Sequence, residues 1–191
     1  MIPRLVVASK NPDKVSEIEG ILSETGLASE IVRGLDWPDV EEIGATLEEN
    51  ALLKARSVVE ATGLPVLADD TGLEVSALDG APGVHTARFA GEAARYEDNV
   101  AKLVKVLAGH DDRSARFRTV VALAFPDGVE VVAEGVLDGI IAKRPKGDGG
   151  FGYDPVFEVE GRTLAEMGVE EKNSLSHRAR AIRALVEYVG A

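Results

Sequence analysis

The 191-residue chain contains no cysteine, one tryptophan and only three histidines. Without cysteine it has no disulfide, no thiolate zinc site and no cysteine nucleophile. The histidines, His85, His110 and His177, do not stand at metal-ligand spacing, which argues against a zinc hydrolase. No Ser/His/Asp triad is evident. Carboxylates, hydroxyls and lysines are therefore the candidate chemical groups.

Basic residues are also scarce, since 21 Lys and Arg stand against 33 Asp and Glu, a net charge of −12. Duplex DNA is bound by broad basic surfaces, so no nucleic-acid partner is expected, whereas a small phosphate ligand needs only a local cluster of cations. No apolar run approaches the ~20 residues that cross a bilayer. The N-terminus has no signal-peptide pattern. We expect a cytoplasmic protein with no membrane partner.

Strand-like apolar runs alternate with helical patterns, which predicts an α/β fold with a sheet flanked by helices, in a single domain over 1–191. Thr46 and Glu49 form a capping box at the start of one helix, and Gly63 ends it; Gly26 is placed to end the helix expected over 14–22. A glycine-rich loop is expected at 146–152. The expected strands are 5–8, 31–32, 65–68, 117–125 and 129–136, and the other helices are 14–22, 99–107 and 175–189.

The strongest candidate for chemistry is the pair Asp69-Asp70, at the end of the buried strand 65–68. Isolated burial of carboxylates is costly, and Mg²⁺ binds through a few carboxylates plus waters and phosphates. Glu41 and Glu42, just ahead of Gly44, are candidates for a further ligand, and the alternative for them is a solvated face. The alternative for the aspartate pair is a turn cap formed with Thr71-Gly72. The pattern predicts a metal site without distinguishing the two aspartates.

A second candidate site is the segment from Ser9 to Lys14, where the first strand meets the first helix. A helix N-terminus offers free N–H groups and a favourable dipole to a phosphate. The alternative is a capped helix with solvated lysines. Lys54 lies four residues after Asn50 on one helix face, suited either to offset phosphate charge or to form an exposed polar pair. The residues of the segment are Ser9, Lys10, Asn11, Pro12, Asp13 and Lys14.

Two further segments suit a nucleobase. Phe151 is flanked by glycines, so that a base can stack on its ring; the alternative is a turn with Phe151 and Tyr153 folded into the core. His177 and Arg178 stand in the first turn of the last helix, where cations oppose the helix dipole. Such a conflict indicates either a binding site or a solvated basic turn. Arg178 can donate to a purine O6 or N7, but not to the 6-amino group of adenine.

Taken in order, these motifs resemble the dITP/XTP pyrophosphatases, also called inosine triphosphate pyrophosphatases, from Leu5 to near the C-terminus. The resemblance implies an elongated mixed sheet in two lobes with a cleft, a homodimer, and Mg²⁺-dependent hydrolysis of nonstandard purine nucleoside triphosphates between the α- and β-phosphates. The motifs that carry it are Ala8-Ser9-Lys10-Asn11, Glu48 to Ala55, Ala68 to Leu73, Gly80 to Val84, Ala87 to Gly91, Gly150 to Pro155, and Ser176-His177-Arg178.

The resemblance also assigns roles to residues. Ser9 to Lys14 and Lys54 would hold the triphosphate, with Lys14 and Lys54 stabilising the transition state. Glu42 and Asp70 would bind Mg²⁺, Asp70 would also act as the base toward water, and Asp69 would assist. Thr71 would contact the substrate. The residues of the implied base pocket are Phe151, Gly152, Tyr153, Asp154, Lys172, His177 and Arg178.

One position departs from the family's pattern, since Lys10 stands where the family usually has glycine. Lysine adopts positive φ less readily than glycine, so we expect either a different loop backbone or an added phosphate contact. Two alternatives to the expected activity stay open. One is a pyrophosphatase for another modified nucleotide, such as a methylated pyrimidine, and the other is a non-catalytic nucleotide sensor.

Overall fold

The computed structural model describes residues 1–190. It confirms the predicted α/β fold, a mixed sheet flanked by helices, in the order β2-β1-β3-β5-β6-β7-β8 with β4 paired to β3. The strands are β1 Ile2–Val7, β2 Ala28–Val32, β3 Val66–Val75, β4 Pro82–Gly83, β5 Ser114–Ala124, β6 Glu130–Ile141, β7 Phe157–Val159 and β8 Arg162–Thr163. The α-helices are α1 Pro12–Thr25, α2 Leu47–Thr62, α3 Tyr96–Val106, α4 Val169–Leu175 and α5 His177–Gly190.

The chain forms two compact units. The first comprises residues 1–70, 119–135 and 177 onward, and the second comprises residues 71–118 and 136–176. Each unit has its own apolar core. Strands β3, β5 and β6 contribute residues to both units.

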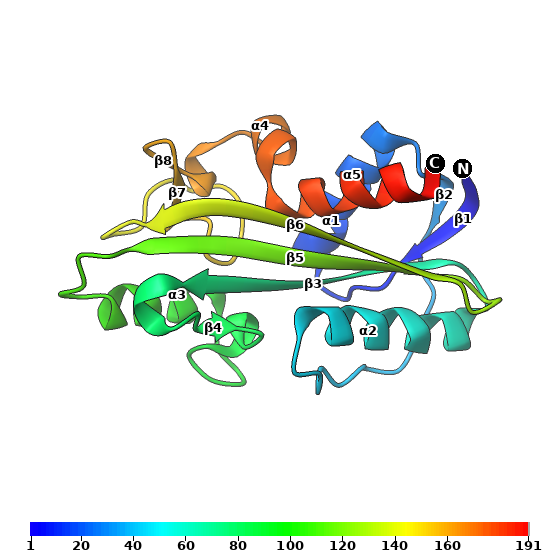
Figure 1. Cartoon of the computed structure of the whole chain (residues 1–191), viewed down its shortest axis with the longest axis horizontal. Coiled ribbons are helices and arrows are strands. Elements are labelled where there is room, and N and C mark those ends of the chain that lie inside the picture. The colour runs from blue at the N-terminus through cyan, green and yellow to red at the C-terminus, as the bar shows by residue number, and fades with distance from the viewer. Residues whose placement is uncertain (191) are drawn as a thin grey trace. The chain divides into compact units, whose positions relative to one another are not determined.

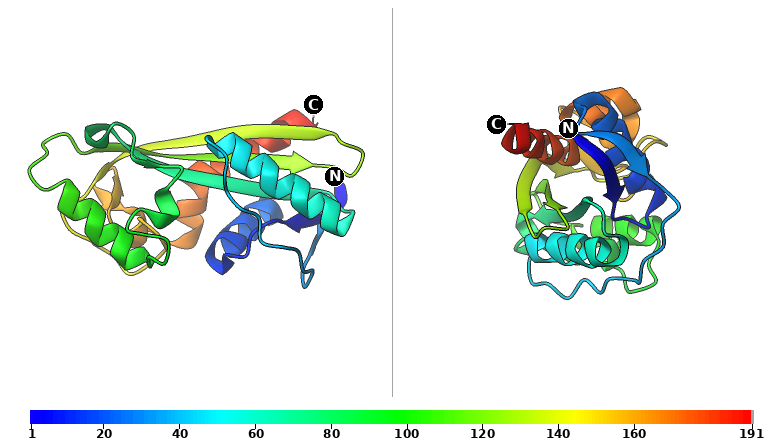
Figure 2. Two further views of the ribbon diagram at one scale, coloured as in Figure 1. Left: turned by 90° about the horizontal axis from the view of Figure 1, so that it is seen from below. Right: turned by 90° about the vertical axis from the view of Figure 1, so that its right-hand side faces the viewer.

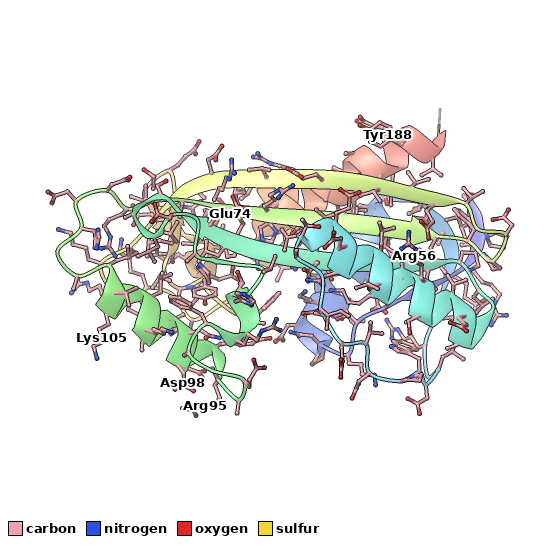
Figure 3. All side chains as sticks on the ribbon, turned by 60° about the horizontal axis from the view of Figure 1, so that its bottom comes forward. Arg56, Glu74, Arg95, Asp98, Lys105 and Tyr188 are labelled. Atoms are coloured by element: carbon pink, nitrogen blue, oxygen red, sulfur yellow. The ribbon has the colours of Figure 1, made fainter. Side chains whose placement is uncertain are left out.

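In the first unit, α1 and α5 cover one face of the sheet and α2 covers the other (Figures 1 and 2). Ile18 and Ile21 of α1 pack with Ile182 and Leu185 of α5 against the strands, and all four are fully buried. Apolar residues at helical spacing produce these buried stripes. Arg56 of α2 makes a bidentate pair with Glu130 at 2.6 and 2.7 Å and so joins α2 to β6 (Figure 3).

The ends of the first two helices follow the expected capping chemistry. The Thr46–Glu49 capping box is present at α2. Gly26 and Gly63 end α1 and α2 in the left-handed conformation, with φ of 64° and 67°. Glycine adopts this conformation without the steric cost of a Cβ. These contacts fix where both helices begin and end, and therefore where Lys14 and Lys54 lie.

In the second unit, α3 packs through Val100 and Leu103 on a core that includes Phe117 and Phe157. At the start of α3, the carboxylate of Asp98 accepts from Arg95 N at 3.0 Å and from Arg95 Nε at 3.3 Å (Figure 3). This helix begins at Tyr96, three residues earlier than the expected 99. Its buried Asn99 accepts from Ala90 N at 2.7 Å and donates to Ala87 O at 2.9 Å, which fixes the preceding loop.

Three expectations need correction. The strand expected at 65–68 continues to Val75, so the aspartate pair lies within β3 and not in a turn with Thr71-Gly72. The helix expected over 175–189 begins at His177, because Ser176 has an extended backbone (φ −63°, ψ 153°) that separates it from α4. Strand β5 begins at Ser114, before the expected 117, and strand β6 continues to Ile141, past the expected 136.

No helix within residues 1–190 is long and apolar enough to cross a membrane.

Candidate active site

Asp69 and Asp70 point to opposite faces of β3, because successive side chains of a strand alternate. Asp69 shares the face of Leu67, toward α1 and α5, and contacts Lys14 and Arg178. Asp70 faces α2 and contacts Asn50 and Lys54. Both are buried, with 2% and 5% of their surface exposed. Strand alternation thus gives the two carboxylates different partners and distinguishes two aspartates that the sequence pattern did not.

The side chain of Lys54 links Asp70 to Glu42. Its Nζ donates to Asp70 Oδ1 and to Glu42 Oε1, each at 2.9 Å, and the lysine side chain is only 12% exposed. The side-chain amide of Asn50 donates to Asp70 Oδ2 at 3.3 Å. The expectation that Asn50 and Lys54 share a helix face is confirmed, and that face is turned to the carboxylate and not to solvent.

Glu42 lies in the loop that connects β2 to α2, and contacts at the start of α2 hold this loop. The Oδ1 atom of Asn50 accepts from Gly44 N at 2.8 Å, and Glu49 accepts from Ala45 N at 2.6 Å. A Cβ on Gly44 would lie 2.6 Å from Asn50 Oδ1, so this close approach requires glycine. Asn50 therefore positions both Asp70 and the loop that carries Glu42.

On the other face of β3, Asp69 lies within a second group of charges. Arg178 donates to Asp69 Oδ2 at 3.1 Å and also pairs with Glu17 of α1. Lys14 Nζ lies 3.4 Å from the same Asp69 oxygen. Arg178 is 1% exposed. The carboxylates of Asp69 and Glu17 account for a buried cation in the first turn of α5.

The pKa values of the aspartates shift in opposite directions. Burial alone would raise the pKa of Asp69, but Lys14 and then Arg178 outweigh it and hold this pKa far below its usual value. For Asp70, burial dominates and raises the pKa despite the charge of Lys54. Burial alone would lower the pKa of Lys54, but Asp70, Asp69 and Glu42 together raise it. Asp69 is therefore a permanent anion and Lys54 a permanent cation near neutral pH.

The Ser9–Lys14 segment forms the N-terminus of α1. The Oδ1 atom of Asn11 accepts from Asp13 N at 3.0 Å and Lys14 N at 3.3 Å, and Ser9 Oγ accepts from Asn11 N at 3.2 Å. Pro12 is the first helical residue. Asn11 thus caps the helix, and the segment's contact with phosphate stays a prediction.

Lys10 occupies its loop without a left-handed backbone. Within residues 1–190, the non-glycine residues with positive φ are Asp79 and Glu160. The Lys10 side chain pairs instead with Asp39 at 2.6 Å in an exposed contact. Lysine is therefore tolerated here without backbone strain.

The donors around Asp70 suit a hard cation. Two carboxylates, Glu42 and Asp70, share one counter-charge, and carboxylate oxygen is the ligand that Mg²⁺ prefers. No group of three or more His, Cys, Asp or Glu side chains suited to a metal occurs within residues 1–190. Mg²⁺ needs no such cage, since waters and substrate phosphates complete its coordination. The residues present therefore fit this ion.

In the second unit, Asp154 organises the expected aromatic platform. It accepts from Lys172 Nζ at 2.6 Å and from Phe151 N at 2.8 Å. The ammonium of Lys172 lies 4.8 Å from the centroid of the Phe151 ring, a cation–π contact. A Cβ on Gly150 would lie 2.1 Å from Asp154 Oδ2, so only glycine fits beside this carboxylate. Three expected base-pocket residues are thus brought together.

Some residues next to the Phe151 platform belong to the apolar core of the second unit. Tyr153 is buried, its hydroxyl donates to Thr86 O at 3.0 Å, and burial raises its pKa. Gly147 and Gly149 lie against Ala165, so this part of the glycine-rich loop is closely packed on its own unit, whereas Gly152 has a φ of 63° and open space beside it. A cavity of about 470 Å³ lies beside Phe151. Its lining includes Tyr96, Val100, Val104, Gly149, Gly150 and Phe151.

The remaining expected residues belong to other parts of the chain. His177 and Arg178 lie in the first unit, in the first turn of α5, where His177 Nδ1 is 2.6 Å from Thr119 Oγ1. Thr71 follows Asp70 in β3 and is partly buried. Glu17 was not among the expected site residues, and its partner Arg178 is 161 residues away. In the sequence, only its position next to the apolar Ile18 could have indicated that Glu17 is buried.

The fold and the buried lysine–carboxylate groups define an α/β protein with a site of the kind that serves phosphate chemistry. The chain belongs to the Ham1 family, whose model matches residues 5–188. The dITP/XTP pyrophosphatase of Streptomyces coelicolor is 49% identical, covering 97% of this chain and 96% of that protein. The relative of the same name from Thermus thermophilus is also 49% identical, with 96% and 90% covered. The Ham1 protein structure from Staphylococcus aureus matches with a TM-score of 0.85 at 39% identity, covering 98% of each chain.

Proposed function

We propose that this chain hydrolyses nonstandard purine nucleoside triphosphates, dITP/ITP and XTP/dXTP, to the nucleoside monophosphate and pyrophosphate. One observation carries the proposal: the Glu42–Lys54–Asp70 group lies in a chain that is 49% identical, over 97% of its length, to a relative named dITP/XTP pyrophosphatase. A cytoplasmic location and a homodimer, the latter implied by the family resemblance, are part of this proposal.

For the chemistry, Glu42 and Asp70 would hold Mg²⁺, which when bound supplies positive charge to the triphosphate and orients it. Asp70 would accept the proton of the attacking water. Lys14 and Lys54 would stabilise the charge that develops on the phosphates. Ser9 to Asp13 and Thr71 would hold the substrate. Asp69, held anionic by Lys14 and Arg178, would keep Lys14 in place.

For base selection, Phe151 offers a stacking face, and Lys172 is already placed over that ring by Asp154. An ammonium only donates hydrogen bonds, so it suits the 6-oxo group of hypoxanthine and xanthine and is mismatched to the 6-amino group of adenine. Tyr153 and Gly152 would shape this pocket. The 6-oxo group is therefore the proposed basis of selectivity.

The Lys172→Met variant tests base selection. We expect kcat/KM for dITP to fall about 10- to 100-fold, as for the loss of a charged hydrogen bond, while the low value for dATP changes little. The matched control is Lys146→Met, which removes another lysine–carboxylate pair of the second unit, that with Glu158 at 3.1 Å. The role of Lys172 would be refuted if Lys172→Met lowered kcat/KM equally for dITP and dATP. It would also be refuted if the control Lys146→Met lost selectivity to the same extent.

A further inference from the structure

The ammonium of Lys54 is bound by the same two carboxylates that are proposed to hold the metal. Its Nζ lies 2.9 Å from Glu42 Oε1 and 2.9 Å from Asp70 Oδ1. These carboxylates come from different segments, the β2–α2 loop and β3, and the lysine comes from α2. The side chains of Lys54 and Asp70 are shielded, with 12% and 8% of their surface exposed, whereas that of Glu42 is 32% exposed.

An ammonium and a divalent cation compete for such oxygens. Two positive charges close together in a poorly solvated site repel each other strongly, so each weakens the binding of the other to the same carboxylate pair. The buried carboxylate of Asp70 without any cation is also costly, because its desolvation is uncompensated. The nucleotide-free protein therefore gains from having Lys54 in this place.

We propose that Lys54 is an exchangeable counter-ion of the metal site, displaced from Glu42 and Asp70 when a divalent cation binds. The inference rests on the proposed function, since it takes these carboxylates as the Mg²⁺ ligands. Once displaced, the ammonium on α2 is available to the phosphates of the substrate. Cation binding and phosphate binding are then coupled, because Lys54 is withheld from the triphosphate until the cation has taken its carboxylates.

The coupling has a measurable cost for the wild-type protein. A ligand's apparent affinity falls by the fraction of protein that is ready to bind it, and Lys54 must leave before the cation binds. Removing Lys54 removes that cost. Lys14 provides a matched control, because it is another lysine whose charge acts on Asp70 but which pairs with Asp69, at 3.4 Å, instead of bridging Glu42 and Asp70.

The test is calorimetric titration of Mg²⁺ into nucleotide-free protein. We expect Lys54→Met to lower the Kd for Mg²⁺ by about tenfold or more relative to wild type, and Lys14→Met to change it by less than about threefold. An unchanged or weaker affinity in Lys54→Met would overturn the exchange. An equal increase in Mg²⁺ affinity in Lys14→Met would also overturn the exchange, because the loss of one nearby positive charge would then explain both results. If neither wild type nor Lys54→Met binds Mg²⁺, the proposed metal site itself fails.

A second measurement uses the wild-type chain and so does not depend on the folding of a variant. Lys54 is acylated by an amine-reactive reagent with and without saturating Mg²⁺, and the modification is quantified by mass spectrometry of its peptide. We expect acylation of Lys54 to increase several-fold with Mg²⁺, while that of exposed Lys105 on α3 stays constant as an internal standard. Protection or no change at Lys54, under conditions where calorimetry shows Mg²⁺ binding, would overturn the exchange alone.

Discussion

Asp70→Asn is expected to reduce pyrophosphate release from dITP by about a thousandfold or more, while the protein remains folded. Loss of a general base costs about 10²- to 10⁴-fold by itself, and this variant also removes one proposed metal ligand. Asparagine retains the shape of aspartate, and its single amide oxygen can keep the contact with Lys54, at 2.9 Å from Asp70 Oδ1, while the contact of Asn50 with Oδ2 at 3.3 Å is lost. The measurement is steady-state kcat with a pyrophosphate-coupled assay.

The control for this variant is Asp138→Asn, which neutralises an exposed aspartate on β6. We expect it to retain wild-type activity. Thermal unfolding of both variants separates loss of chemistry from loss of fold. An Asp70→Asn protein that is folded and within about tenfold of wild-type activity would contradict the base assignment, because general base catalysis contributes more than this.

Arg178→Met is expected to be the most destabilising of the substitutions proposed for this chain, by about 3–5 kcal/mol. The guanidinium is 1% exposed and paired with both Asp69 and Glu17. Removing it leaves the buried carboxylates of Asp69 and Glu17 without the cation that they share. Asp69 keeps an ion pair with Lys14, but at 3.4 Å this pair is longer than the 3.1 Å pair with Arg178 that is lost. The free energy of unfolding in urea provides the measurement.

Two further variants make the Arg178 result specific. Arg183→Met, on the same helix, removes an exposed pair with Glu24 at 3.3 Å and is expected to cost less than about 1 kcal/mol. The double variant Arg178→Met/Glu17→Gln is expected to be less destabilised than the sum of its single variants, because one unpaired charge is gone. If Arg178→Met is no more destabilising than Arg183→Met, the structural role of Arg178 is contradicted.

Local signals predicted both ends of α2 and the glycine after α1, whereas α1 itself, Pro12–Thr25, is longer at both ends than the expected 14–22. The Thr46–Glu49 capping box and the glycines at positions 26 and 63 act within one or two turns, so the sequence shows them directly. The expected end of β3 was wrong, because Thr71-Gly72 has the composition of a turn. Pairing with neighbouring strands decides that this segment continues to Val75.

Because the strand was expected to end at residue 68, the sequence pattern did not distinguish Asp69 from Asp70. A strand that continues through Asp69 and Asp70 places their side chains on opposite faces by alternation alone. Their partners were less accessible to prediction. The link of Arg178 to Glu17 spans 161 residues and depends on how α1 and α5 pack on the sheet, which no local pattern encodes.

The most direct measurement is pyrophosphate release from dITP, XTP and dATP, each with and without Mg²⁺. We expect rapid release of pyrophosphate and the monophosphate from dITP and XTP, dependence on Mg²⁺, and much slower release from dATP. Equal rates on all three purines would contradict the proposed selectivity for the 6-oxo group. Binding of dITP in Mg²⁺ without turnover would contradict the enzyme itself and favour a nucleotide sensor.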